Sequence, residues 1–151
     1  GSFLANNFEA KALLDLRVNN VKSSYQIKDF MIDDIPLLDE ENSSVVDVLR
    51  FIEDYKLGFV IFKNSLGNFV GIASNADVRR AFLKHPNDFT KITVDDIVNK
   101  SPFVLNENLT IYEMLNLIEQ QNFVVNFFPV IYDDSKPVGA VTFFNLIRSE
   151  I

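Results

Sequence analysis

Ser74 and Asp77 combine residue types and a spacing that could hold a small polar ligand. They stand three residues apart at a predicted strand-to-helix junction, and Thr142 stands at the matching junction of the second half. A helix start presents unpaired backbone N–H groups and the positive end of the helix dipole, and both attract phosphate. The same pair also reads as a capping box, in which a hydroxyl and a carboxylate bond backbone N–H groups. Capping and binding can coexist, so both interpretations stay open.

The other reactive side chains do not form a recognisable catalytic set. The sequence has no cysteine, and its one histidine, His85, stands at a predicted helix end, where a cation beside the helix dipole is expected. No Ser/His/Asp pairing is suggested, so we expect no enzymatic activity. A run of acids flanks predicted turns and a helix start, where acids are common, and we expect no metal site there. These acids are Asp33, Asp34, Asp39, Glu40 and Glu41.

Composition and charge exclude several classes of function. The 151 residues carry a net charge of −7, from 14 lysines and arginines against 21 acids. A protein that binds a nucleic-acid backbone usually shows a basic face, so we expect no nucleic-acid partner. No apolar run approaches the roughly 20 residues of a membrane-spanning helix, so we expect no membrane partner. Hydrophobic residues make up 48%, enough for a core, and the lack of cysteine fits a cytoplasmic protein.

Two copies of one sequence pattern organise the chain. The distance from Gly71 to Gly139 is 68 residues, and so is the distance from Ser74 to Thr142. An internal repeat of this length indicates two structural units of the same kind. The matched segments are Ile27–Met31, Pro36–Leu38, Phe59–Phe62 and Phe69–Ser74 in the first copy, and Val94–Val98, Pro102–Val104, Phe128–Ile131 and Pro137–Thr142 in the second.

Each copy reads as β-α-β-β-α. A short strand is expected at Leu37–Leu38 and at Phe103–Val104. Amphipathic helices follow, beginning near Ser43 or Ser44 and at Thr110, each with an acid placed to complete a capping box. Two strands joined by a polar turn come next, and a last helix starts at the junction described above.

The predicted fold class is α/β (α+β), with two β-α-β-β-α units related by a pseudo-twofold axis and packed sheet to sheet. A three-stranded sheet with helices on one face leaves the other face bare, and two such units bury both faces by packing together. Clefts between the copies are then favoured ligand sites. The expected boundaries are 1–24 for an N-terminal helix and linker, 25–85 for the first unit, 86–93 for a linker and 94–151 for the second unit.

The segment Gly71–Val78 resembles the closing signature of a cystathionine β-synthase-type (CBS) domain. That signature is a glycine, two apolar residues, Ser or Thr, two variable residues, Asp and an apolar residue. Phe128–Asp134 and Gly139–Thr142 are similar to the second half of the same family, and Ile27–Met31 resembles its opening segment. The likeness covers about residues 25–151. It implies a tandem pair that usually forms a homodimer through its helices and binds AMP, ADP, ATP, S-adenosylmethionine or a related nucleotide between the copies, with no required cofactor.

The resemblance also implies which residues would hold the nucleotide. The Ser or Thr would contact phosphate, the Asp would hold the ribose hydroxyls, and residues before the first and second strands would enclose the base. For the first cleft these are Ser74 and Asp77, with Ile35, Pro36, Gly58 and Phe59 near the base. For the second they are Thr142, with Ser101, Pro102, Asn126 and Phe127 near the base. The position matching Asp77 is Asn145, which is neutral, so we expect at most one good site per chain and favour a simple cap for Thr142.

The sequence thus predicts a regulatory module that senses an adenosine-type nucleotide and modulates an attached or partner domain. One alternative is a dimerisation or interaction scaffold that binds no nucleotide. Another is a sensor of a sugar nucleotide, because Asp77–Arg80 resembles the Asp-apolar-Arg-Arg run in the CBS pair of arabinose-5-phosphate isomerase-type sugar-phosphate isomerases. Arg79 and Arg80 could reach a phosphate, but we favour a solvated helix face for both.

Overall fold

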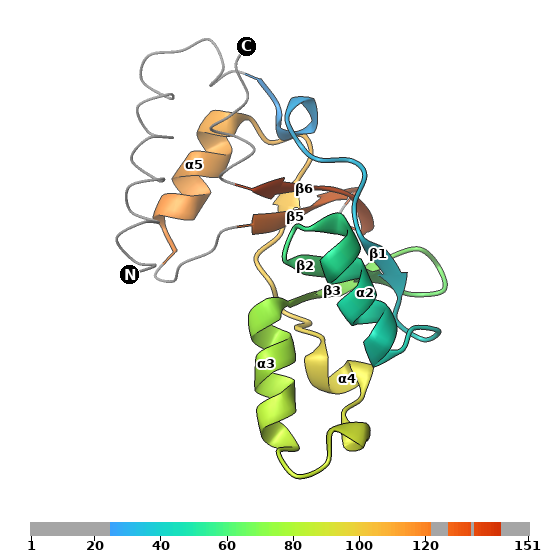
Figure 1. Cartoon of the computed structure of the whole chain (residues 1–151). Helices are drawn as coiled ribbons and strands as arrows, with labels where there is room; N and C mark the ends of the chain where they lie inside the picture. Colours follow the sequence, from blue (N-terminus) through green and yellow to red (C-terminus); the bar gives the residue numbers. More distant parts are fainter. Residues whose placement is uncertain (1–24, 122–126, 134, 143–151) are drawn as a thin grey trace. The chain divides into compact units, whose positions relative to one another are not determined.

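The computed structural model describes residues 25–121, 127–133 and 135–142 and divides the chain into two compact units (Figure 1). The Ser74 unit consists of Asp34–Phe103 and Ser135–Pro137. The described residues of the Thr142 unit are 25–33, 104–121, 127–133 and 138–142. The secondary structure is mixed α and β, and each unit contains one three-stranded sheet, in agreement with the predicted class.

The sheet of the Ser74 unit has the strand order β1-β2-β3, with β1 at Leu37–Asp39, β2 at Phe59–Lys63 and β3 at Phe69–Ser74. All three strands lie where the sequence predicts them. The central strand β2 runs parallel to β1 and antiparallel to β3. As a consequence, the starts of β1 and β2 and the end of β3 meet at one end of this sheet.

Three α-helices belong to the Ser74 unit: α2 at Val45–Tyr55, α3 at Asn75–Lys84 and the short α4 at Val94–Ile97. A 3-10 helix, η3, occupies Phe89–Lys91. The buried side chains of one core cluster come from β1, β2, β3, α2, α3, α4 and the residues just before α4, and they exclude water from the space between helices and sheet. They are Leu38, Val48, Val60, Phe62, Ala73, Ala81, Ile92 and Ile97.

Side-chain oxygens cap the helix starts, as predicted. Ser44 caps α2 with Asp47 as its reciprocal partner, and Thr110 caps α5 with Glu113. These contacts satisfy backbone N–H groups that the first turn of a helix leaves unpaired. The apolar stripe of α2 is buried less completely than its pattern predicts, since Leu49 stays 39% exposed.

The Thr142 unit repeats the sheet order as β4-β5-β6. Its described elements are η2 (Ile27–Asp29), β4 (Leu105–Asn106), α5 (Ile111–Glu119), β5 (Phe127–Tyr132) and β6 (Lys136–Thr142), and the first two residues of β6 count with the Ser74 unit. The predicted strand Phe103–Val104 is wrong by two residues. The strand begins at Leu105 because this fully buried side chain occupies the position paired with Val130 of β5.

The opening segments of the two sequence copies are exchanged between the sheets. The segment that opens the second copy pairs with β3 of the first copy, and the segment that opens the first copy pairs with β6 of the second. Asn99 and Ile72 of β3 exchange two backbone hydrogen bonds of 2.7 and 3.0 Å. Ile32 and Ala140 of β6 exchange two bonds of 2.8 and 2.9 Å. Each compact unit therefore depends on residues from both copies.

In each strand, a glycine leaves room for the opening segment that pairs with it. A Cβ atom on Gly71 would collide with the carbonyl oxygen of Asn99 and lie 2.9 Å from Cγ1 of Val98. A Cβ atom on Gly139 would lie 2.6 Å from Sδ of Met31 and 2.7 Å from a backbone oxygen. Both distances are shorter than van der Waals contact allows, so the two glycines of the repeat are explained by the close approach of the opening segments.

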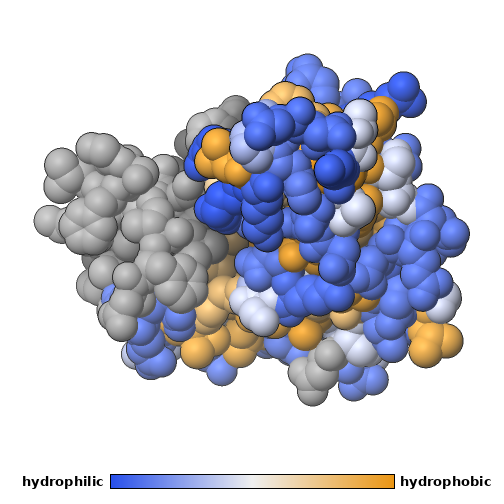
Figure 2. All heavy atoms as spheres, turned by 90° about the horizontal axis from the view of Figure 1, so that it is seen from below, coloured by the Kyte–Doolittle hydropathy of each residue, from blue (hydrophilic) through white to orange (hydrophobic). Residues whose placement is uncertain are grey.

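The predicted N-terminal helix and the predicted last helix of the second copy lie outside the described residues. No helix within the described ranges is long and apolar enough to cross a membrane. Hydrophilic residues dominate the face shown in Figure 2, with apolar residues in smaller groups among them. Scattered exposed apolar side chains are normal for a folded domain. The large ones are Val46, Leu49, Leu66, Leu83, Phe89, Tyr112 and Tyr132.

Candidate nucleotide site

Ser74 is both the last residue of β3 and the N-cap of α3. Its backbone is extended, with φ −102° and ψ 170°, so the strand runs into the helix without an intervening loop. The Ser74 hydroxyl accepts a hydrogen bond of 3.2 Å from the backbone N–H of Asp77, and the Ser74 backbone N–H donates to Oδ2 of Asp77 at 2.9 Å. The capping box predicted from the sequence is therefore present.

The Asp77 carboxylate has two further partners. The Ser74 hydroxyl donates to Oδ2 at 2.9 Å, and the guanidinium of Arg80 donates to Oδ1 at 2.6 Å. The side chain of Asp77 is only 12% exposed, whereas that of Arg80 is 61% exposed. Both carboxylate oxygens thus face donors, and one of the three donors is the solvent-exposed guanidinium of Arg80.

The start of β2 lies directly beside this junction. Phe59 is the register partner of Ser74 across the antiparallel pair β2–β3. The carbonyl oxygen of Gly58 accepts a bond of 3.1 Å from the backbone N–H of Asn75. Gly58 has φ +80°, a left-handed conformation that glycine adopts without steric cost. The turn before β2 is therefore held against the first residue of α3.

Ile35 and Pro36 approach the same end of the sheet from the other side of β2. The carbonyl oxygen of Pro36 accepts a bond of 2.8 Å from the N–H of Ile61, which continues the parallel pairing of β1 with β2. The order across this end is thus Ile35 and Pro36, then Gly58 and Phe59, then Ser74. The structure brings together all six residues proposed for the first set, although the Phe59 side chain is fully buried.

The second set of proposed residues is not assembled in one unit. Phe127 begins β5 and Thr142 ends the neighbouring strand β6, both in the Thr142 unit. Ser101 and Pro102 belong to the Ser74 unit, where the Ser101 N–H donates to Oδ1 of Asn99 at 3.0 Å. Asn126 and Asn145 lie outside the described residues.

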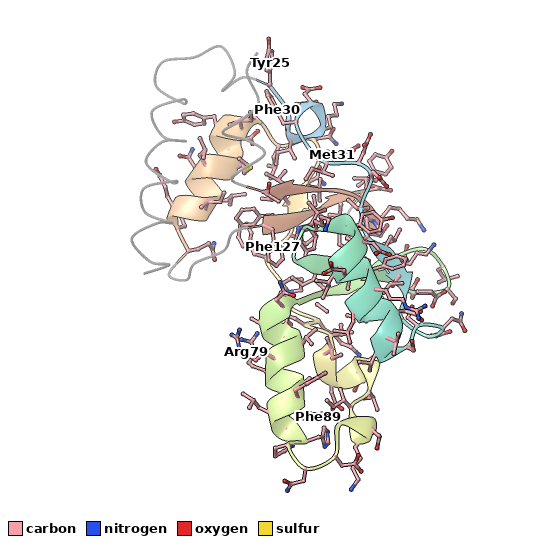
Figure 3. The ribbon with its side chains drawn as sticks, in the orientation of Figure 1. Tyr25, Phe30, Met31, Arg79, Phe89 and Phe127 are labelled. Carbon is pink, nitrogen blue, oxygen red and sulfur yellow. The ribbon has the colours of Figure 1, made fainter. Side chains whose placement is uncertain are left out.

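The arginines after Asp77 differ in their surroundings. Arg79 extends outward from α3 (Figure 3) and is exposed to solvent, as the interpretation of a solvated helix face predicts. Arg80 instead turns back to Asp77 and forms the ion pair described above. Sequence reasoning missed this pair, although the three-residue spacing between Asp and Arg on a predicted helix is a signal for it.

Structural contacts account for several of the other charged side chains. His85, which follows α3 as its C-cap, lies 3.4 Å from Asp96, a partner that sequence reasoning also missed. The backbone N–H of Thr93 is the main cause that holds the pKa of Asp96 below its ordinary value, with smaller contributions from the Thr93 hydroxyl and His85. Among the described residues, no group of three or more His, Asp or Glu is arranged to hold a metal ion.

Part of the predicted acid cluster is held by backbone and lysine contacts. Asp39 accepts a bond of 2.9 Å from the N–H of Glu41. Lys100 lies 3.4 Å from both Glu40 and Asp95. The hydrogen bond with Asp95, followed by the charge of Glu40, raises the pKa of Lys100. These contacts are those of acids that stabilise turns and the start of a helix.

Comparison with known proteins identifies the family. The family model of the CBS domain matches residues 27–84 and 94–150. This chain belongs to the CBS-domain family. It contains a tandem pair of CBS domains, in agreement with the resemblance of the two sequence copies. No curated protein sequence matches the chain significantly.

Several solved CBS-domain structures share the fold. CBSX2 of Arabidopsis thaliana, solved in complex with AMP, has 22% identity and a TM-score of 0.66 over 82% of this chain and 94% of that chain. The CBS domain pair of protein MJ0100, solved with 5′-methylthioadenosine and S-adenosyl-L-methionine, has 18% identity and a TM-score of 0.67 over 82% of this chain and 94% of that chain.

A third similar structure is an uncharacterized conserved protein from Pyrococcus horikoshii, with 16% identity and a TM-score of 0.71 over 93% of this chain. This chain spans 60% of the length of that relative. At these identities the comparisons show the CBS-pair fold.

Proposed function

We propose that this CBS pair is a non-catalytic regulatory module that binds an adenosine-type nucleotide at the Ser74 end of the β1-β2-β3 sheet. One observation supports the proposal above all. The six residues that the resemblance assigns to the first site come from three separate stretches of sequence, and the strand topology gathers them at one end of one sheet. The similar pairs solved with AMP and with S-adenosyl-L-methionine make an adenosine ligand the first candidate.

Each part of such a nucleotide has a suitable partner in the proposed site. The Asp77 carboxylate can accept hydrogen bonds from the two ribose hydroxyls, with the added strength of a charged acceptor. The start of α3, beyond Ser74, offers a favourable dipole end for phosphate. The base would lie near Ile35, Pro36, Gly58 and Phe59.

We propose that the second set of residues contributes little to nucleotide binding. Asn145 replaces the Asp that would hold the ribose, and a neutral amide binds a diol less strongly than a carboxylate does. The remaining members of this set would line that weaker position. They are Thr142, Ser101, Pro102, Asn126 and Phe127.

Regulation would require that the nucleotide bind one arrangement of the pair more tightly than another. A ligand shifts a conformational equilibrium only by its difference in affinity for the two states. We propose that the chain acts as a homodimer in the cytoplasm and passes this shift to a fused or separate effector enzyme. The functional repeats in this proposal are residues 25–85 and 94–151, joined by the linker 86–93.

Titration of the full chain with AMP, ADP, ATP, S-adenosylmethionine and a UDP-sugar tests the proposal. A ligand present at one hundred times its Kd should raise the free energy of unfolding by about 2.7 kcal/mol, which thermal unfolding detects. Asp77→Ala should weaken binding roughly tenfold to a hundredfold, because hydrogen bonds to a charged group are lost.

Asp47→Ala is the matched control, since Asp47 holds the same position in the capping box of α2. This variant should lose a similar cap and keep its ligand affinity. Equal losses of affinity in the two variants would mean that Asp77 acts only through stability.

The alternative of an interaction scaffold is favoured by Asn145 and by the fact that the Asp77 oxygens already have donors. If no nucleotide at millimolar concentration changes the unfolding midpoint, the scaffold replaces the sensor. A response to the UDP-sugar alone would instead favour the finer resemblance to the sugar-phosphate isomerases, which rests on Asp77–Arg80.

A further inference from the structure

The ion pair between Arg80 and Asp77 has a consequence for ligand choice at the proposed nucleotide site. Oδ1 of Asp77 is bonded to the Arg80 guanidinium at 2.6 Å, while Oδ2 accepts from the backbone and the hydroxyl of Ser74. The contacts to Oδ2 belong to the helix cap. Each carboxylate oxygen accepts about two hydrogen bonds, so Oδ2 is filled and Oδ1 has one acceptor position left. The two hydroxyls of a ribose need two positions, so one of them must compete with Arg80 for Oδ1.

We propose that Arg80 makes the site selective for adenosine derivatives that carry a phosphate, over neutral or cationic derivatives. This inference rests on the proposed function. The Arg80 side chain is 61% exposed and flexible, so it can leave Asp77 without unfolding the helix. A neutral nucleoside breaks the ion pair and gives the displaced guanidinium no new partner.

A nucleotide, unlike a nucleoside, offers the displaced Arg80 guanidinium a new partner in its phosphate. Its phosphate is joined to the same ribose whose hydroxyls occupy Asp77, so the phosphate arrives near the displaced guanidinium. Guanidinium and phosphate form charge-assisted, often bidentate hydrogen bonds. The exchange replaces an Asp77–Arg80 pair by an Asp77–ribose contact and an Arg80–phosphate contact. S-adenosylmethionine places a sulfonium cation where the phosphate would be, and Arg80 repels it.

The neighbouring arginine on α3, Arg79, supplies a control. Arg79 precedes Arg80 on α3 and carries the same charge, but it extends outward into solvent (Figure 3). Arg79→Gln therefore removes one positive charge from the same helix and leaves the Asp77–Arg80 pair in place. A general electrostatic attraction of anions would weaken equally in Arg79→Gln and Arg80→Gln.

Calorimetric titration of the full chain with AMP, adenosine and S-adenosylmethionine tests the inference. We expect wild type to prefer AMP. In Arg80→Gln, adenosine should bind roughly two- to fivefold more tightly, the factor expected for removal of an exposed competing ion pair. AMP should lose its phosphate contact, so the ratio of AMP to adenosine affinity should fall about tenfold. Arg79→Gln should keep the wild-type ratio.

The outcomes separate this inference from the function on which it rests. An unchanged ratio in Arg80→Gln, equal effects of the two arginine variants, or a wild-type preference for S-adenosylmethionine would overturn the role of Arg80 and leave the nucleotide site intact. If wild type binds none of the three ligands at millimolar concentration, the nucleotide site and the role of Arg80 are both overturned.

Discussion

The Ser74 unit contains two helix starts with the same Ser-x-x-Asp sequence and different surroundings. At α2, Ser44 and Asp47 exchange the reciprocal bonds of a capping box, with distances of 2.8 and 3.1 Å. At α3, Ser74 and Asp77 exchange the same bonds at 2.9 and 3.2 Å. The second start differs because it follows a strand directly, lies beside the turn at Gly58, and holds the Arg80 guanidinium on its carboxylate.

The comparison shows that the motif alone specifies a cap, whereas its position in the fold makes one cap a candidate site. The backbone N–H of Ser44 is the main cause of the lowered pKa of the Asp47 carboxyl, with smaller contributions from the Ser44 side chain and the charge of Arg50. Asp77 adds a displaceable cation on Oδ1. A ligand can gain from the second arrangement because one of the two carboxylate oxygens is held by a side chain that can move.

The largest expected effect concerns the strand that leads to Ser74. Gly71→Ala should lower the free energy of unfolding by about 1–3 kcal/mol, because the new methyl group meets the Asn99 carbonyl oxygen and Val98. Chemical denaturation measures the change. Ser43→Ala, in the turn that leads to the α2 cap, is the control and should change stability by less than about 0.5 kcal/mol. If Gly71→Ala leaves the stability unchanged, the close contact between Asn99 and β3 does not determine the position of the strand that leads to Ser74.

A smaller effect distinguishes the two caps themselves. Ser44→Ala should cost about 1 kcal/mol, the usual value for a lost N-cap. Ser74→Ala should cost more, up to about 2 kcal/mol, because the bonds between Ser74 and Asp77 are partly buried, whereas those between Ser44 and Asp47 are exposed to water. Urea unfolding of the two variants gives the comparison. Equal costs would show that the partial burial of the α3 cap contributes nothing to stability.

The smallest effect is the pH dependence of the α2 cap. The folded pKa of Asp47 lies below its ordinary value of 3.8, so the folded state favours the ionised carboxyl. Its contribution is complete above that value and is lost as the pH falls through the lower folded pKa. The melting temperature of Asp47→Asn should therefore lie below that of wild type at neutral pH and approach it in acid.

Local patterns predicted most of the described elements and all the helix starts on which the comparison rests. The strands β1, β2 and β3 and the caps at Ser44, Ser74 and Thr110 were predictable because alternation, amphipathic spacing and capping residues act within a few positions of the chain. The gathering of the first site at one sheet end was predictable only through the family resemblance, since it depends on strand order.

Contacts between distant segments were not predictable from local pattern. The start of β4 at Leu105 depends on which side chain pairs with Val130, and the sequence marks Phe103 and Val104 as equally apolar. The pairing of His85 with Asp96 requires α3 and α4 to pack together. The pairing of Asn99 with Ile72 is indicated in the sequence only by Gly71, the glycine that leaves room for it.

Because the opening segments are exchanged, the sequence repeat and the compact structural unit do not have the same boundaries. Residues 94–103 follow the linker, yet Ile97 lies in the same buried cluster as Leu38 and Phe62, and Asn99 extends the edge of β3. A single copy of the repeat would lack the segment that pairs with the edge strand of its own sheet. A single copy expressed alone could cover that strand only by borrowing the segment from a second molecule.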